Sequence, residues 1–237
     1  MAGHSKWANI KHKKAAQDAK RSKHFMKYSK DILIAIKDGG SDPEQNARLR
    51  TAIQTAKAGN MPNDNIKRLL EKANKDNSDW QELTYEGYGP GGVAVLVECV
   101  TDNVNRTAAY VKSSFSKGGG NMGTTGSVSY MFHTKGIIVL DPEVVDSEKA
   151  MEIALMAEAT DIKDQDGVIV VETEPTNLLS TKEAFEAEGI TEFLTAEVSK
   201  VPDMKVELSE EQNDKLQKLI DLLEESDDVN DVHTNVE

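Results

Sequence analysis

The sequence predicts a multi-domain chain of α and α+β parts. We expect an N-terminal three-helix bundle with a basic arm, followed by two small α+β domains, the second inserted in the first. Three observations lead there: apolar residues keep helical spacing over residues 22–75, strand and helix patterns alternate over 92–236, and the charge changes sign near residue 80. Residues 1–80 carry a formal charge of +8 and residues 81–237 carry −21. A chain of 237 residues has room for one to three small domains.

Three apolar runs at helical spacing predict the bundle. Gly39-Gly40 are expected to end the first helix and Gly59-Asn60 the second, because these residues favour the helix C-terminus. Asp42 is expected to cap the second helix, with Pro43 in its first turn. The polar stretch 74–81 is typical of a linker.

The second half of the chain changes to alternating strands and helices. Expected strands cover residues 93–100, 127–132, 137–140, 168–171, 196–201 and 229–236. Residues 85–92 are rich in glycine and predict a turn at the domain entry, and Ser209 to Gln212 predict a helix capping box. Grouping these elements predicts the following domains: 1–80; 81–135 with 206–237; and the inserted 136–205.

The first thirty residues are the main functional candidate. They contain nine Lys or Arg and one acid, so their formal charge is +8. Few apolar residues accompany these charges, so the segment cannot bury enough surface to offset its ordering entropy alone. A solvated charge run is the simpler reading, but the interleaved Trp favours contact with nucleic acid. The candidate nucleic-acid-binding residues are Lys6, Trp7, Lys11, Lys13, Lys14, Lys20, Arg21 and Lys23.

A glycine-rich segment, residues 118–123, formally matches the dinucleotide-binding pattern. That pattern requires a strand before it and a helix after it, and here the expected order is reversed. We therefore reject dinucleotide binding. The segment is then either a flexible connection or a mobile loop whose backbone approaches phosphate beside Lys112 and Lys117.

Arg106 is a weaker candidate for binding an anion. It falls in the first turn of a predicted helix that Asn103 or Asn105 caps, where a cation opposes the helix dipole. An external phosphate would explain this position, and a neighbouring carboxylate would explain it equally well.

The sequence offers no catalytic or metal-binding motif. Cys99 is the single cysteine and lies in an apolar run, so it predicts a core residue and neither a disulfide nor a thiolate site. The five histidines match no metal spacing. We infer no cofactor, no small-molecule substrate and no enzyme. The lack of a membrane-length apolar segment and of a secretory signal predicts a cytoplasmic protein without membrane contact.

Several long motifs occur in order along nearly the whole chain, at residues 2–12, 14–21, 60–66, 85–92 and 126–132. Together they resemble the YebC/PmpR family, which includes a mitochondrial translational activator of a cytochrome oxidase subunit. The resemblance implies a helical domain and two α+β domains around a cleft. It also implies no catalysis, since members are described as probable DNA-binding transcriptional regulators or as ribosome-associated factors that aid synthesis of proline-rich stretches.

We therefore expect a nucleic-acid-binding regulator of gene expression that contacts DNA or ribosomal RNA, with the ribosome as a further partner. The family description favours DNA. The residues favour RNA, because phosphate contacts position a protein without reading sequence and no base-reading helix is evident. The alternative is an acidic interaction protein whose basic arm docks an acidic protein partner. An enzyme working in the cleft is a third hypothesis and lacks any motif.

Overall fold

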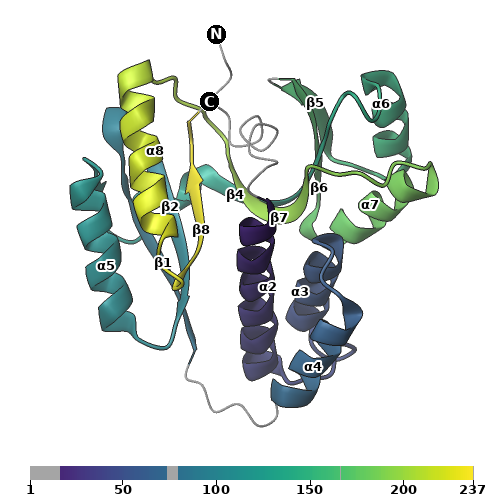
Figure 1. Cartoon of the computed structure of the whole chain (residues 1–237), viewed down its shortest axis with the longest axis horizontal. Helices are drawn as coiled ribbons and strands as arrows, with labels where there is room; N and C mark the ends of the chain where they lie inside the picture. The colour runs from purple at the N-terminus through teal and green to yellow at the C-terminus, as the bar shows by residue number, and fades with distance from the viewer. Residues whose placement is uncertain (1–16, 74–79, 166, 237) are drawn as a thin grey trace. The chain divides into compact units, whose positions relative to one another are not determined.

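The computed structural model describes residues 17–73, 80–165 and 167–236 (Figure 1). The helices are α2 (Gln17–Gly39), α3 (Ala47–Ala58), α4 (Asn63–Ala73), α5 (Val104–Lys117), α6 (Ser147–Met156), α7 (Leu178–Ala187) and α8 (Glu210–Glu224). The strands are β1 (Gln81–Tyr88), β2 (Ala94–Thr101), β3 (Asn121–Met122), β4 (Phe132–Leu140), β5 (Asp161–Gln165), β6 (Val168–Thr173), β7 (Thr195–Pro202) and β8 (Val229–Thr234). This order confirms the predicted fold class. Among the described residues, no helix is long and apolar enough to cross a bilayer.

The chain divides into two compact units. The first unit combines residues 1–76 with 134–199, and the second combines 77–133 with 200–237. Within the first unit, Ala58 of α3 joins the core that α7 helps to form, and Lys182 Nζ donates to Asn60 Oδ1 at 3.0 Å. The three-domain boundaries expected from sequence remain a prediction.

Three helices, α2, α3 and α4, form the helical part of the first unit, as predicted (Figure 1). The cap of α3, however, was predicted wrongly. Asn46, which is buried, accepts from the Leu49 N–H and donates to the carbonyls of Ala35 and Gly40 at 2.6 and 2.8 Å. An amide can accept and donate at once, which the carboxylate of Asp42 cannot. Asp42 instead caps the exposed turn before the helix, accepting from the Glu44 N–H.

The sheet of the first unit has the order β5-β6-β4-β7. Its core forms where Ile138 and Leu140 of β4 and Ile169 and Val171 of β6 pack with α6 and α7, around Phe185. Strand β5 was not predicted, because this edge strand is mostly polar and lacks an apolar pattern.

The sheet of the second unit has the order β3-β1-β2-β8. Helices α5 and α8 pack on one face, where Val95, Val97 and Cys99 meet Phe115 and Leu219 (Figure 1). The apolar burial of Cys99 agrees with its prediction as a core residue. The Ser209–Gln212 capping box opens α8 as predicted.

The predicted turn over residues 85–92 is shorter than expected. All eight residues of β1, through Tyr88, pair antiparallel with β2, and the turn itself covers only Pro90–Gly92. The sequence of β1 is polar and contains glycine, so it lacks a recognisable strand pattern. The strand forms because it pairs with β2.

The predicted strand at residues 127–132 is wrong except at Phe132, where β4 begins. Ser129–Met131 form a 3-10 turn, because the buried Glu86 carboxylate takes the backbone N–H groups that a strand partner would need. Glu86 accepts from Gly126, Val128 and Ser129 at 2.7, 2.7 and 2.8 Å. Burial would raise the pKa of Glu86, but these three backbone hydrogen bonds lower it below its usual value.

The glycine segment after α5 connects this helix to β3 and makes backbone hydrogen bonds and close packing contacts. Gly120 N–H donates to the Phe115 carbonyl at 2.8 Å, and Gly123 N–H donates to the Glu86 carbonyl at 2.7 Å. A Cβ at Gly118 would lie 2.6 Å from Leu219 Cβ, and one at Gly120 would lie 2.7 Å from the Tyr88 carbonyl oxygen. The glycines therefore allow close packing of backbone against α8 and β1.

We predict that Asn46→Ala lowers the free energy of unfolding by about 2–3 kcal/mol, because the helix cap and two buried hydrogen bonds are lost. Asp42→Ala is the matched control and should cost less than about 1 kcal/mol, since its turn is exposed. Urea denaturation followed by circular dichroism measures both. A larger loss for Asp42→Ala would show that Asp42 is the true cap.

We predict that Glu86→Gln costs about 2 kcal/mol of stability, because the amide NH2 faces backbone donors. Hydrogen exchange at the amides of Gly126, Val128 and Ser129 should accelerate. Glu207→Gln, at an exposed site of the same unit, should change neither quantity. Unchanged exchange in Glu86→Gln would contradict the role assigned to this carboxylate.

Candidate nucleic-acid interface

Most of the basic residues predicted from sequence lie outside the described residues. These are Lys6, Trp7, Lys11, Lys13 and Lys14. Their role stays a prediction.

Three further candidates fall on α2. Lys20 and Arg21 belong to its first two turns, but their side chains lie outside what the structure describes. Lys23 follows on the same helix and is half-buried. Binding of nucleic acid by these residues also stays a prediction.

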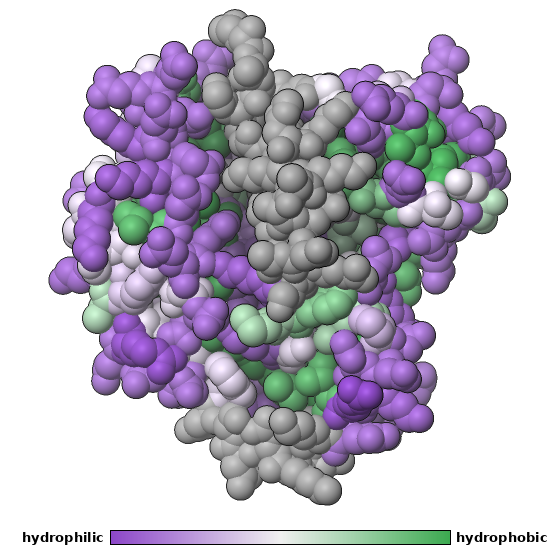
Figure 2. Space-filling model, in the orientation of Figure 1, coloured by the Kyte–Doolittle hydropathy of each residue, from purple (hydrophilic) through white to green (hydrophobic). Residues whose placement is uncertain are grey.

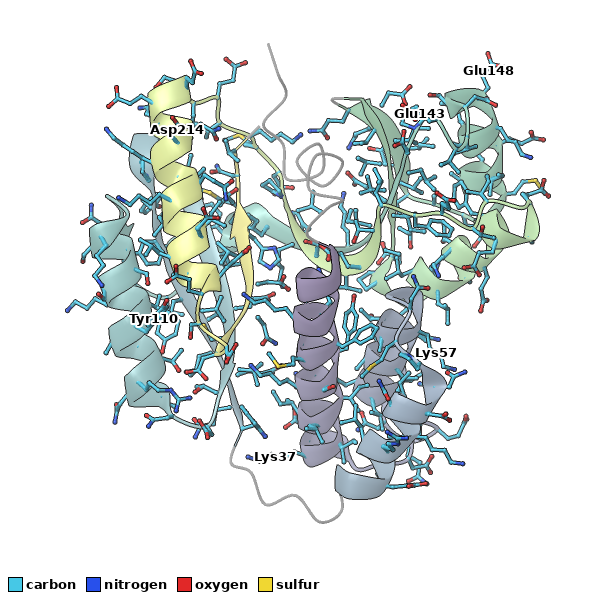
Figure 3. All side chains as sticks on the ribbon, in the orientation of Figure 1. Lys37, Lys57, Tyr110, Glu143, Glu148 and Asp214 are labelled. Carbon is cyan, nitrogen blue, oxygen red and sulfur yellow. The ribbon has the colours of Figure 1, made fainter. Side chains whose placement is uncertain are left out.

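The folded helical part extends this positive region. Residues 1–76 contain 17 bases and 8 acids, a formal charge of +9. Lys57 at the end of α3 and Lys67 and Arg68 on α4 are exposed, and Figure 3 shows Lys57 directed away from the bundle. Our sequence reasoning missed these residues. Their positions on the polar faces of the two predicted helices, α3 and α4, could have indicated that they are exposed.

Arg106 is engaged within the fold. Its Nε and Nη2 lie 2.9 and 2.7 Å from the two carboxylate oxygens of Asp228, and Nη2 lies 2.9 Å from Asp102 Oδ1. The hydrogen bonds that Arg106 donates to Asp228 and then to Asp102 raise the pKa of Arg106 far above its usual value. The neighbouring-carboxylate explanation therefore accounts for this cation, and Asn103 is the cap of the helix.

Lys112 and Lys117 are both exposed on α5. This helix contains no acidic residue. Lys117 lies in the last turn, where a cation interacts favourably with the helix dipole, so its position also has a purely structural cause. Phosphate binding by this pair stays a prediction.

An aromatic candidate was also missed. Tyr130 is 68% exposed, at the 3-10 turn that Glu86 fixes, and Tyr88 OH donates to the Ser127 carbonyl at 3.0 Å. The incorrect strand prediction hid this exposure. An exposed ring on a fixed turn can stack on a nucleobase.

One group of described side chains could approach a single metal ion. The potential ligand atoms of Glu98, Asp231 and His233 all lie within 4.8 Å of one another. However, His233 Nε2 already lies 3.0 Å from Glu98 Oε2, and Lys200 Nζ lies 4.0 Å from Glu98 Oε1. Burial would raise the pKa of Glu98, but His233 and Lys200 lower it. His233 and Lys200 already engage this carboxylate, and we assign it no metal.

The rest of the first unit is strongly acidic. Residues 134–199 contain 16 acids and 4 bases, a formal charge of −12. Each of the four lysines lies in an ion pair: Lys135–Glu172 (2.5 Å), Lys149–Glu188 (3.7 Å), Lys163–Asp161 (2.6 Å) and Lys182–Glu186 (2.9 Å). With four bases against sixteen acids, the segment keeps a strongly negative net charge, which disfavours contact with a polyanion there.

Comparison with known proteins identifies the family. The family model described as "TACO1/YebC protein N-terminal domain" matches residues 5–76. The family model described as "TACO1/YebC second and third domain" matches residues 80–236. The chain belongs to the TACO1/YebC family. This confirms the resemblance drawn from the sequence motifs.

Relatives match the chain over its whole length. A "Probable transcriptional regulatory protein" of Treponema denticola is 54% identical over 239 residues, covering 100% of this chain and 96% of the relative. A protein of the same description from Geobacillus thermodenitrificans is 48% identical and covers 100% and 97%. The crystal structure of a conserved hypothetical protein from Aquifex aeolicus has a TM-score of 0.80 and 43% identity, covering 98% of this chain and 97% of that one.

The TACO1/YebC chain should lose stability at neutral pH, and with it part of the acid sensitivity of its fold, when Glu172 is removed. Burial would raise the pKa of Glu172, but hydrogen bonds from Lys135 and Lys163 lower it. A lowered folded-state pKa stabilises the fold above the unfolded pKa of about 4.3, and this stabilisation disappears as pH falls through the folded value.

We therefore predict that Glu172→Gln lowers the free energy of unfolding by about 2 kcal/mol at pH 7. The difference from wild type should shrink as the pH falls below about 4. Urea denaturation at several pH values measures it. A difference that stays constant with pH would contradict the charged ion-pair role of Glu172.

Proposed function

We propose that this TACO1/YebC chain is a nucleic-acid-binding regulator of gene expression that binds nucleic-acid phosphates with its N-terminal basic residues. The separation of charge carries the proposal: residues 1–76 are at +9 within a chain whose net charge is −13. Charged Lys and Arg supply sequence-independent affinity for phosphate. The naming of relatives as "Probable transcriptional regulatory protein" agrees with a regulatory role.

Structured RNA, including ribosomal RNA, is our preferred target over promoter DNA. Phosphate contacts alone read no sequence, so a sequence-specific repressor would also need base-reading side chains. Exposed Lys57, Lys67 and Arg68 would add phosphate contacts, and Tyr130 would offer a stacking surface. We propose no catalytic step and no cofactor, since the activity consists of binding.

The salt dependence of binding tests the basic residues. With about six phosphate contacts, the log-log slope of affinity against salt should be roughly −4 to −5. Lys11→Ala/Lys13→Ala/Lys14→Ala should make the slope shallower by roughly 2 to 3. Lys205→Ala/Lys215→Ala/Lys218→Ala, three exposed lysines of the second unit, are the matched control and should leave it unchanged. Equal slopes of log affinity against log salt for the two triple variants would contradict the proposal.

Crosslinking in cells followed by sequencing separates the targets. Recovery of ribosomal RNA at one site would support the RNA proposal, whereas recovery of promoter DNA would support transcriptional control. A protein partner that stays bound after complete nuclease digestion, without recovered nucleic acid, would favour docking of the basic arm on an acidic protein.

A further inference from the structure

Helix α6 presents an apolar face to solvent. Met151, Leu155 and Met156 are 48%, 69% and 82% exposed, whereas the opposite side of the helix is buried in the core through Ile153 and Ala154. Met151 and Leu155 are four residues apart and therefore neighbours on the helix surface. Figure 2 shows hydrophobic atoms surrounded by hydrophilic ones in the region where Figure 1 places α6. Among the residues that the structure describes, the side chains of Met151, Leu155 and Met156 thus remain largely exposed.

The same face carries negative charge. Glu148 and Glu152 are exposed and lie on the turns that hold Met151, Leu155 and Met156, and Figure 3 shows Glu148 directed outward from the helix. Lys149 is the single base of α6, and it faces Glu188 at 3.7 Å. Apolar and acidic side chains thus share this surface, and the one base of α6 itself is already in an ion pair.

The surroundings reinforce this charge. The segment 134–199 is at −12, and all four of its lysines are held in ion pairs. A ligand must therefore bring positive charge as well as apolar side chains, which excludes nucleic acid and disfavours a second acidic copy of α6.

We propose that this α6 face, defined by Glu148, Met151, Glu152, Leu155 and Met156, docks a cationic amphipathic helix of a protein partner. The partner's apolar side chains would pack on Leu155 and on the two methionines, and the flexible methionine thioethers adapt to different shapes. Its Lys or Arg side chains would pair with the two glutamates and speed association. The proposal uses none of the residues assigned to nucleic acid and does not depend on that function.

The test uses the full-length chain and two labelled synthetic peptides of about 14 residues, four helical turns. The first, the Leu-Lys peptide, combines Leu and Lys at the spacing of an amphipathic helix. The second, the Ser-Lys peptide, has Ser in place of every Leu and the same net charge. Fluorescence anisotropy should show that the Leu-Lys peptide binds about tenfold tighter than the Ser-Lys peptide. Equal binding of both peptides would overturn the proposal, because the apolar residues would then contribute nothing.

Variants locate the site on α6. Met151→Ser/Leu155→Ser should weaken the Leu-Lys peptide about tenfold and leave the Ser-Lys peptide unchanged. Glu148→Gln/Glu152→Gln should weaken both peptides about threefold or more. The matched control is Glu210→Gln/Asp214→Asn, an exposed acidic pair at the same spacing on α8, which should change binding less than twofold. Because all these side chains are exposed, thermal denaturation should confirm that each variant stays folded.

Three results would overturn the proposal. If the control variant weakens peptide binding as much as Glu148→Gln/Glu152→Gln does, the loss of affinity would come from the net charge of the protein and not from a site on α6. A dimer in sedimentation velocity that Leu155→Ser dissociates would make a second copy the occupant. A synthetic peptide of residues 1–22 that binds tighter than the Leu-Lys peptide, and only when Leu155 is intact, would make the chain's own basic segment the occupant.

Discussion

The antiparallel pairing of β8 with β2 is the contact on which the arrangement of the chain depends. It joins Val95 to Thr234 and Cys99 to Val229, so the last strand lies beside one from the first half of the chain. Hydrogen bonds from two side chains, which join residues similarly far apart in the sequence, reinforce the pairing. Asp228 holds Arg106, and Asn235 Oδ1 accepts from the Ala94 N–H at 2.8 Å. The second unit therefore cannot be completed until nearly the whole chain is available.

This closure also explains how the chain accommodates its middle segment. The chain leaves the second unit after His133 and returns at Lys200. The two crossing points are tied together, because Asp203 N–H donates to the Met131 carbonyl at 2.9 Å and His133 Nε2 lies 2.8 Å from Asp203 Oδ2. Residues 134–199 can thus form a separate sheet at little cost to the β2–β8 pairing, since their ends are held close together.

Sequence periodicity predicted many elements that have apolar patterns, among them α2 to α5, β2, β4, β6, β7, α8 and β8. It failed where one polar side chain decides the backbone. Asn46 was overlooked because its advantage over Asp42 depends on carbonyls of the preceding helix and turn. Glu86 turned an expected strand into a 3-10 turn from about forty positions away. At the candidate site, charge counting found the basic segment, but only the fold revealed that Asp228, distant in sequence, holds Arg106.

The acidic surroundings of α6 are connected to a requirement of the core. Glu172 is buried on the central strand β6, and a buried carboxylate needs charged partners. Lys135 and Lys163 both converge on it, at 2.5 and 3.0 Å. These are two of only four bases among residues 134–199. With half of the local bases committed to one internal carboxylate, Glu148 and Glu152 remain uncompensated beside exposed apolar side chains. An apolar residue in place of Glu172 would remove one negative charge and the ion-pair partner of Lys135, whereas Lys163 would keep its ion pair with Asp161 at 2.6 Å. Both changes would weaken the negative potential that a cationic partner would meet.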